Sequence, residues 1–206
     1  MSCILAIELS TSRGHIAVRR DGELVFEKDF TSHRSHNSML YAPLAAALEV
    51  AGGALDKIVI GTGPGSYTGV RISIAAAHGV AISRQVPVIG LPSIAALSEA
   101  PEHVAVGDAR RGKFYAALIR EGEMVGEVAL LDEAGLRAWL DERADLPCFT
   151  SDGAAPLQLA RVTIAQPSAV LLALHAEIVQ ANELDIEPLY VQDAFITKAK
   201  TPTMGA

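Results

Sequence analysis

The feature that most constrains this chain is an internal repeat of a strand–turn–strand–turn–strand pattern. The first copy predicts strands at residues 3–9, 15–19 and 23–30, with a polar turn at 10–14 and an Asp21-Gly22 hairpin turn. The second copy predicts strands at 103–108, 113–120 and 124–130, with turns at 109–112 and 121–123. Glu8 and Asp108, Gly14 and Gly112, and Gly22 and Gly122 fall at equivalent places. The repeat therefore predicts two like-folded halves.

Each copy is followed by segments with helical or buried-strand patterns. After the first copy we expect a helix at 35–52, a strand at 58–60, a helix at 68–83, a short strand at 86–91 and a brief helix at 92–98. After the second we expect a helix from 131 to 140, a strand at 147–150, a short helix at 153–159 and a helix at 169–181. This predicts α/β halves at 1–100 and 101–206, each with three antiparallel strands extended by parallel ones and covered by helices.

Composition limits the environment and the partners of the chain. Its 206 residues carry a net charge of −7, without a basic cluster, so we expect it not to grip tRNA by itself. No apolar stretch reaches the ~18 residues that span a bilayer, and the apolar run at 3–7 is too short for a secretory signal. Cys3 and Cys148 lie in apolar contexts, which predicts free buried thiols. We expect a cytoplasmic protein with no membrane partner.

The stretch at 61–72 joins a predicted strand to a predicted helix. Its structural turn residues are Gly63, Pro64, Gly65, Ser66 and Gly69. Ser66 or Thr68 can cap the helix, and the helix N-terminus could receive an anion. The stretch contains no Walker A lysine and no dinucleotide glycine spacing, so a tight turn that serves close packing is the favoured interpretation.

The helix that follows this turn is nearly free of charge and carries small residues four positions apart. Such faces allow another helix to approach closely, and an all-round apolar helix is buried on more than one side. With the helix at 35–52 it predicts an interface for a partner protein. The predicted interface residues are Met39, Leu40, Leu44, Ser73, Ala76, Ala77, Gly79, Val80 and Ser83.

Several stretches, spread over nearly the whole chain, resemble one family. They are residues 4–12 (ILAIELSTS), 63–72 (GPGSYTGVRI), 108–111 (DARR) and 187–190 (EPLY), and together they resemble the TsaB (YeaZ) family, whose members also appear as M22 peptidase or glycoprotease homologues. The resemblance implies the duplicated actin-like ATPase fold (ASKHA, ribonuclease H-like) with two similar subdomains. It also implies an accessory role in forming threonylcarbamoyladenosine at position 37 of tRNAs that read codons beginning with A.

The resemblance further implies partners. These are a TsaD-type catalytic subunit, a TsaE-type ATPase, and tRNA reached only through the complex. Glu8, Tyr67 and Gln192 depart from the Asp, Phe and Arg that are usual in the family.

The turns that would grip a nucleotide in such a fold are incomplete. The degenerate nucleotide site comprises Glu8, Ser10, Thr11, Asp108, Arg110 and Arg111. The first turn keeps hydroxyls, but the second offers arginines where glycines would let the backbone approach phosphates. We therefore predict no cofactor, with ATP or ADP only at a subunit junction. Arg110 and Arg111 are equally compatible with contact to an acidic partner or nucleotide and with an exposed turn.

The sequence contains no complete set of residues for a metal site or for hydrolysis. His33 and His36 stand three apart without a nearby carboxylate, so no metal site is expected. Ser66 lacks a base and an orienting acid, so no catalytic residue is assigned. The favoured hypothesis is a non-enzymatic scaffold that pairs with the catalytic subunit and forms a homodimer when alone. The alternative is a stand-alone ATP-dependent enzyme or M22-like peptidase of the same fold.

Overall fold

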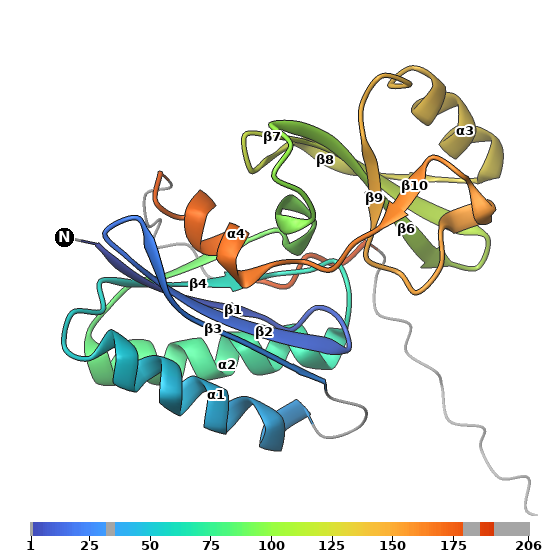
Figure 1. Cartoon of the computed structure of the whole chain (residues 1–206). Helices are drawn as coiled ribbons and strands as arrows, with labels where there is room; N and C mark the ends of the chain where they lie inside the picture. Colours follow the sequence, from blue (N-terminus) through green and yellow to red (C-terminus); the bar gives the residue numbers. More distant parts are fainter. Residues whose placement is uncertain (1, 32–35, 179–185, 192–206) are drawn as a thin grey trace, which may run out of the picture.

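The computed structural model describes residues 2–31, 36–178 and 186–191. It contains two five-stranded mixed sheets (Figure 1). The first sheet has the order β3-β2-β1-β4-β5 and is built from β1 (Cys3–Glu8), β2 (Arg13–Arg20), β3 (Glu23–Thr31), β4 (Lys57–Gly61) and β5 (Val88–Leu91). Strands β1, β2 and β3 are antiparallel, while β4 and β5 extend the sheet in parallel.

The second sheet repeats this plan with the order β10-β9-β6-β7-β8. Its strands are β6 (Glu102–Arg110), β7 (Lys113–Arg120), β8 (Glu123–Leu131), β9 (Cys148–Thr150) and β10 (Val162–Ile164). Again three strands are antiparallel and two are parallel. The predicted duplicated actin-like α/β fold is confirmed. We call each sheet with its helices a lobe.

Helices cover the first sheet on both faces. Helices α1 (His36–Ala51) and α2 (Tyr67–Arg84) lie side by side on one face, and α4 (Ala169–His175) lies on the other (Figure 1). Alternation along β1 explains this arrangement, because Cys3, Leu5 and Ile7 join the core under α1 and α2 while Ile4 and Ala6 join the core under α4. Although α4 lies beyond residue 100 in the sequence, it packs on the first lobe.

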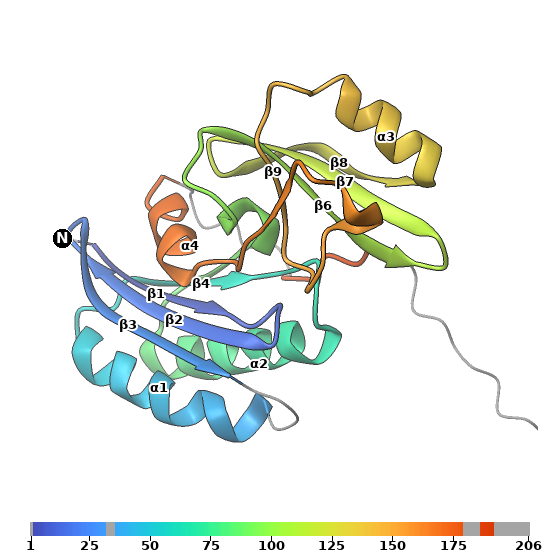
Figure 2. The same cartoon turned by 45° about the vertical axis from the view of Figure 1, so that its right-hand side comes forward.

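The second sheet is also covered on both faces. Helix α3 (Glu133–Asp141) packs through Leu136 and Leu140 on one face, and the short 3-10 helix η1 (Ser93–Ala96) packs on the other. Ala96 of η1 also joins the core under α4. Helices η1 and α4 therefore lie between the two sheets (Figure 2). A second 3-10 helix, η2 (Pro156–Gln158), connects β9 to β10.

The strand register corrects two equivalences expected from the repeat. Strand β7 aligns with β2 at an offset of 100 residues, so the counterpart of Gly14 is Phe114 rather than Gly112. Arg20 pairs with Cys3 in the first lobe, whereas Arg120 pairs with Glu102 in the second, so β6 aligns with β1 at an offset of 99 residues. The counterpart of Glu8 is therefore Gly107, and Asp108 lies one position further on. Glu8 is buried, whereas Asp108 is exposed.

Most predicted elements are present, with shifted ends. The short helix expected at 153–159 is reduced to η2, and β10 was not predicted. The final helix ends at His175 rather than at residue 181, and residues 179–181 of that prediction, with His33 and Gln192, fall outside the described residues. Cys3 and Cys148 are free and buried, as expected. Within the described ranges, no helix is long and apolar enough to cross a bilayer.

Candidate functional site

A cavity of about 550 Å³ lies between the two lobes. Its wall comes from the β1–β2 turn, the glycine-rich turn before α2, the β6–β7 turn, the loop after β9 and the segment at 189–191. Ser10, Thr11, Asp108 and Arg110 of the predicted nucleotide site line it, whereas Glu8 and Arg111 do not. The structure thus brings four of these six residues to one cavity.

The side chain of Glu8 binds the backbone of the turn that follows β1. It ends β1, its side chain is fully buried, and its Oε1 accepts a hydrogen bond from the backbone N–H of Ser10. Its Oε2 lies over Gly61 at the end of β4, where even a Cβ atom would collide with it. Burial raises the pKa of Glu8, although hydrogen bonding with Ser10 and Ser93 opposes the shift. The side chain is therefore a packed part of the first lobe rather than a group open to solvent.

The second turn is closed by carboxylates as well. Asp108 Oδ1 accepts a hydrogen bond of 2.7 Å from the backbone N–H of Arg110, and Asp152 Oδ2 accepts one of 2.7 Å from the N–H of Asp108. Burial raises the pKa of Asp152, and the negative charge of Asp108 adds to this. Arg110 Nη1 is 4.0 Å from Asp108 Oδ2, with the arginine side chain 86% exposed. One backbone donor at the first turn and two at the second are thus bonded to the chain's own carboxylates.

The glycine-rich turn packs against the first turn. The backbone N–H of Ser66 donates to Ser10 O at 2.6 Å, and a Cβ at Gly65 would collide with the Ser10 backbone. A Cβ at Gly69 would collide with Leu9 O. Ser66 caps α2 by accepting from the N–H of Gly69 at 3.1 Å. Close backbone approach accounts for these glycines, and Gly63, with Pro64 after it, adopts a positive φ of 98°.

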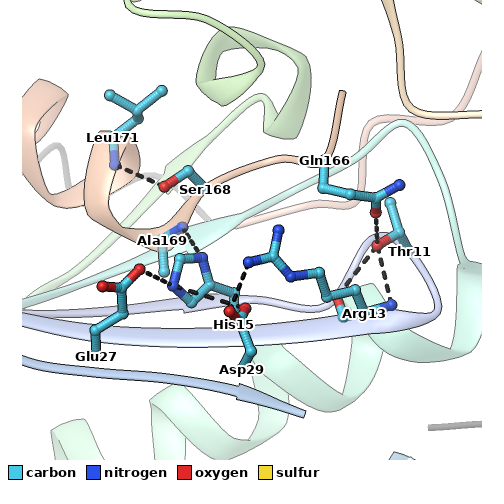
Figure 3. A network of polar contacts seen from close by, with 9 residues as sticks. All are labelled: Thr11, Arg13, His15, Glu27, Asp29, Gln166, Ser168, Ala169 and Leu171. Atoms are coloured by element: carbon cyan, nitrogen blue, oxygen red, sulfur yellow. Dashed lines mark hydrogen bonds and ion pairs between the residues drawn. The ribbon is translucent and has the colours of Figure 1, made fainter. Parts of the chain in front are cut away.

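A polar network joins the cavity wall to α4 (Figure 3). Thr11 Oγ1 lies 2.8 Å from Gln166 Oε1, on the segment that leads into α4. Buried His15 accepts from the N–H of Ala169 at Nδ1 and donates from Nε2 to Glu27, at 3.0 Å in each case. This network attaches the start of α4 to β2 and β3.

An ion pair at the edge of this network involves the carboxyl group of Asp29. Arg13 Nη2 lies 2.6 Å from Asp29 Oδ2, and the hydrogen bond from Arg13 lowers the pKa of Asp29. The pair connects the start of β2 to β3, so it supports the strand that carries His15.

The predicted partner-interface residues divide into two groups. Met39, Gly79 and Ser83 are exposed, and Ala76 and Val80 are half-buried. Leu40, Leu44, Ser73 and Ala77 are buried in the core of the first lobe, which corrects their assignment to an interface. The small side chains of Ser73 and Ala77 let α2 approach the sheet rather than another protein.

The exposed face of α1 and α2 contains two large side chains that the sequence prediction missed. Ile82 is 81% exposed and Tyr41 is 64% exposed. Around Gly79 on the same face, a Cβ atom would meet nothing within 4 Å. Helical spacing does place Ile82 seven residues after the exposed Ala75, but spacing alone did not show which face of α2 the sheet covers.

Of the residues considered for a metal or hydrolase site, His33 lies outside the described part of the chain. In the described part of the chain, no group of three or more His, Cys, Asp or Glu side chains could hold a metal ion. The Ser66 hydroxyl accepts the N–H of Gly69 as a helix cap. What the cavity can do chemically is offer carboxylate and hydroxyl oxygens, with Arg110 at its edge.

Known proteins resemble this chain in sequence and fold. The family model of TsaD, tRNA N6-adenosine threonylcarbamoyltransferase, matches residues 30–135. The tRNA threonylcarbamoyladenosine biosynthesis protein TsaB of Bacillus subtilis is 32% identical over 148 residues, or 67% of this chain and 64% of that protein. The TsaB protein of Escherichia coli is 31% identical over 130 residues, or 58% of this chain and 56% of that protein. The match thus spans somewhat more than half the length of these relatives.

Solved structures agree over a larger part of the chain. A Pseudomonas aeruginosa protein described as similar to peptidase YEAZ superposes with a TM-score of 0.72 at 26% identity, over 93% of this chain and all of the other. YeaZ from Pseudomonas aeruginosa superposes with a TM-score of 0.70 at 26% identity, over 86% of this chain and 92% of the other. Both lobes of the present fold are therefore found together in these proteins.

Proposed function

Because the chain belongs to the TsaB (YeaZ) family, we propose that it is a non-catalytic scaffold subunit for threonylcarbamoyl transfer to adenosine 37 of tRNAs that read codons beginning with A. It acts by forming a heterodimer with a TsaD-type catalytic subunit, and a TsaE-type ATPase joins the same complex. The tRNA is bound through the complex rather than by this chain, whose net charge of −7 disfavours contact with a phosphate backbone.

One observation carries the non-catalytic part of the proposal. In the turns of the two lobes, the N–H groups of Ser10, Arg110 and Asp108 are bonded to the carboxylates of Glu8, Asp108 and Asp152. A phosphate that used these N–H groups would have to displace three carboxylates. Two of them, Asp108 and Asp152, line the cavity, and their negative charge would repel the phosphate. The chain should therefore not hydrolyse ATP.

The partner surface is the exposed face of α1 and α2. Met39, Tyr41, Gly79 and Ile82 expose apolar or small groups to solvent on this face. Large exposed apolar groups that gather on one surface favour contact with another protein. A like-folded catalytic subunit would present two corresponding helices, so that four helices meet.

A reconstituted modification assay tests the proposal. Threonylcarbamoylation of tRNA by the TsaD-type and TsaE-type subunits should require this chain, and Ile82→Arg should abolish both co-purification with the TsaD-type subunit and modification. The control Ala134→Arg places an arginine at an exposed position of α3 in the second lobe. It should preserve co-purification and modification. Modification at full rate by the Ile82→Arg variant would contradict the proposed surface. ATP hydrolysis by the purified chain that is lost in Asp108→Ala would contradict its non-catalytic role.

A further inference from the structure

A groove of about 410 Å³ lies on the face of the first sheet that carries α4. Helix α4 is short and packs on β1, β2 and β4, so it leaves the edge strand β3 largely uncovered on this face. The wall of the groove comes from Leu24 and Glu27 of β3, from the start of α4, and from residues 96–99 at the end of η1. We call this space the α4–β3 groove. An open groove beside an edge strand can receive an extended segment of chain.

One part of the wall of this groove is apolar. Leu24 is 42% exposed on β3, and Val170 of α4 is half-buried opposite the buried Leu97 and Leu171. Leu174 is also exposed and lies one helical turn after Val170, so the apolar strip continues along α4. Exposed apolar side chains that gather around a groove favour contact with another apolar group.

Acidic side chains line the same groove. Glu27 of β3 points toward the start of α4 (Figure 3), and Glu99 is exposed beyond η1. The Glu27 carboxylate accepts a hydrogen bond from His15, which leaves further lone pairs for a second donor. Among the described residues that line the groove, none is a lysine or an arginine. The α4–β3 groove therefore favours a ligand that combines basic and apolar side chains.

The chain itself contains a segment with this combination. Residues 195–200 have the sequence FITKAK, in which two apolar residues are followed by two lysines. Val191, the last described residue before this segment, packs on the core cluster that contains Leu97. Leu97 also lines the α4–β3 groove, and a fully extended chain from 192 to 200 spans roughly 30 Å. The position of Val191 therefore places this segment within reach of the groove.

We propose that residues 195–200 bind in the α4–β3 groove. The two apolar residues of the segment pack on Leu24 and on α4, and its lysines pair with Glu27 and Glu99. Because Val191 packs against the second sheet and the groove belongs to the first lobe, the bound segment links the two lobes. This inference concerns contacts within one chain and does not rest on the proposed scaffold role.

Limited trypsin digestion of the full chain tests this proposal. Binding in the groove protects the peptide bonds after Lys198 and Lys200, and the rate of cleavage there follows the fraction of chains with the segment released. Leu24→Asp should speed this cleavage roughly 4- to 15-fold, the factor for loss of one or two buried methylene groups. Glu99→Gln should speed it roughly 2-fold, as expected for one exposed ion pair. Mass spectrometry of the digest measures both rates.

Matched controls come from the edge strand β8 of the second lobe. Leu130→Asp and Glu127→Gln change exposed residues of the same types as Leu24 and Glu99, and both should leave the cleavage rate unchanged. If Leu24→Asp cleaves at the rate of the unaltered chain, the segment does not bind in this groove and the proposal is overturned.

Cross-linking of the full chain identifies the occupant of the groove. Leu24→Cys combined with Phe195→Cys should form a link within one chain on treatment with a short bismaleimide, because the native Cys3 and Cys148 are buried. The yield should not depend on protein concentration. A link between two chains would make a second copy the occupant and overturn the proposal, as would the absence of any link. These outcomes do not affect the scaffold role, which the modification assay tests separately.

Discussion

Glu8 and Gly61 occupy one small space at the ends of two neighbouring strands. The carboxyl group of Glu8 lies where a side chain at Gly61 would begin, and the Ser93 hydroxyl borders the same space. Gly61→Ala should therefore lower the free energy of unfolding by roughly 1–3 kcal/mol, the usual cost of overpacking a core. Gly79→Ala is the matched control, because it lies in open space in a helix and should raise stability by up to about 1 kcal/mol. Urea unfolding of both variants measures the difference.

The same carboxyl should make stability depend on pH. Burial raises the pKa of Glu8 in the folded chain above its ordinary 4.5, so the folded state binds the proton more tightly than the unfolded state. The stabilisation from the protonated form is present below pH 4.5 and is lost as the pH rises through the folded-state pKa. Glu8→Gln, which cannot ionise, should gain stability relative to the unaltered chain as the pH rises from 4 to 7. If the stability difference between Glu8→Gln and the unaltered chain stays constant over this range, Glu8 is not a buried carboxyl with a raised pKa.

At the scale of elements, two histidines lie where η1, α4 and β6 meet. His103 Nε2 lies 3.1 Å from Ile94 O, and His175 packs against Gly122 in the β7–β8 turn. Burial lowers the pKa of both imidazoles below 6.5, and for His175 the nearby His103 adds to this. The unfolded chain takes up protons first as the pH falls, so stability should decrease below about pH 6.5. Urea unfolding at pH 7.5 and 5.5 should show this decrease, and His175→Gln should make it smaller.

The elements themselves were largely predictable, because hydrophobic periodicity and turn residues are local signals. The repeat gave both sheets, and Ser66 was correctly identified as a possible cap of α2. The alignment of Glu8 with Asp108 was wrong because a hairpin register depends on strand pairing, which a count of residues does not show. Asp152 and Tyr190 were not identified because they reach the cavity only through tertiary packing of segments distant in sequence.

At the scale of the whole molecule, the outer face of α1 and α2 is the surface that we propose for contact with a second protein. Helices α1 and α2 cover the first sheet on the side opposite α4 (Figure 1). Tyr41 on α1 and Ile82 on α2 are exposed. An isologous contact uses one surface twice, so this face can pair with itself through a two-fold axis. Two helices from each chain can supply the ~1,200–2,000 Å² of a standard interface. We expect a homodimer of the isolated chain that is replaced by a heterodimer when the TsaD-type subunit is added.

Gly79→Arg tests this expectation better than Ala77→Arg, since Ala77 is buried and an arginine there would disrupt the core. At Gly79 the added side chain meets open space within the chain but stands where a second helix must approach. Sedimentation should then show a folded monomer that no longer binds the TsaD-type subunit, with circular dichroism unchanged. Ala134→Arg on α3 should sediment as a dimer and bind the subunit normally. If Gly79→Arg forms the heterodimer with unchanged affinity, the contact lies on another surface and the helical face has a different role.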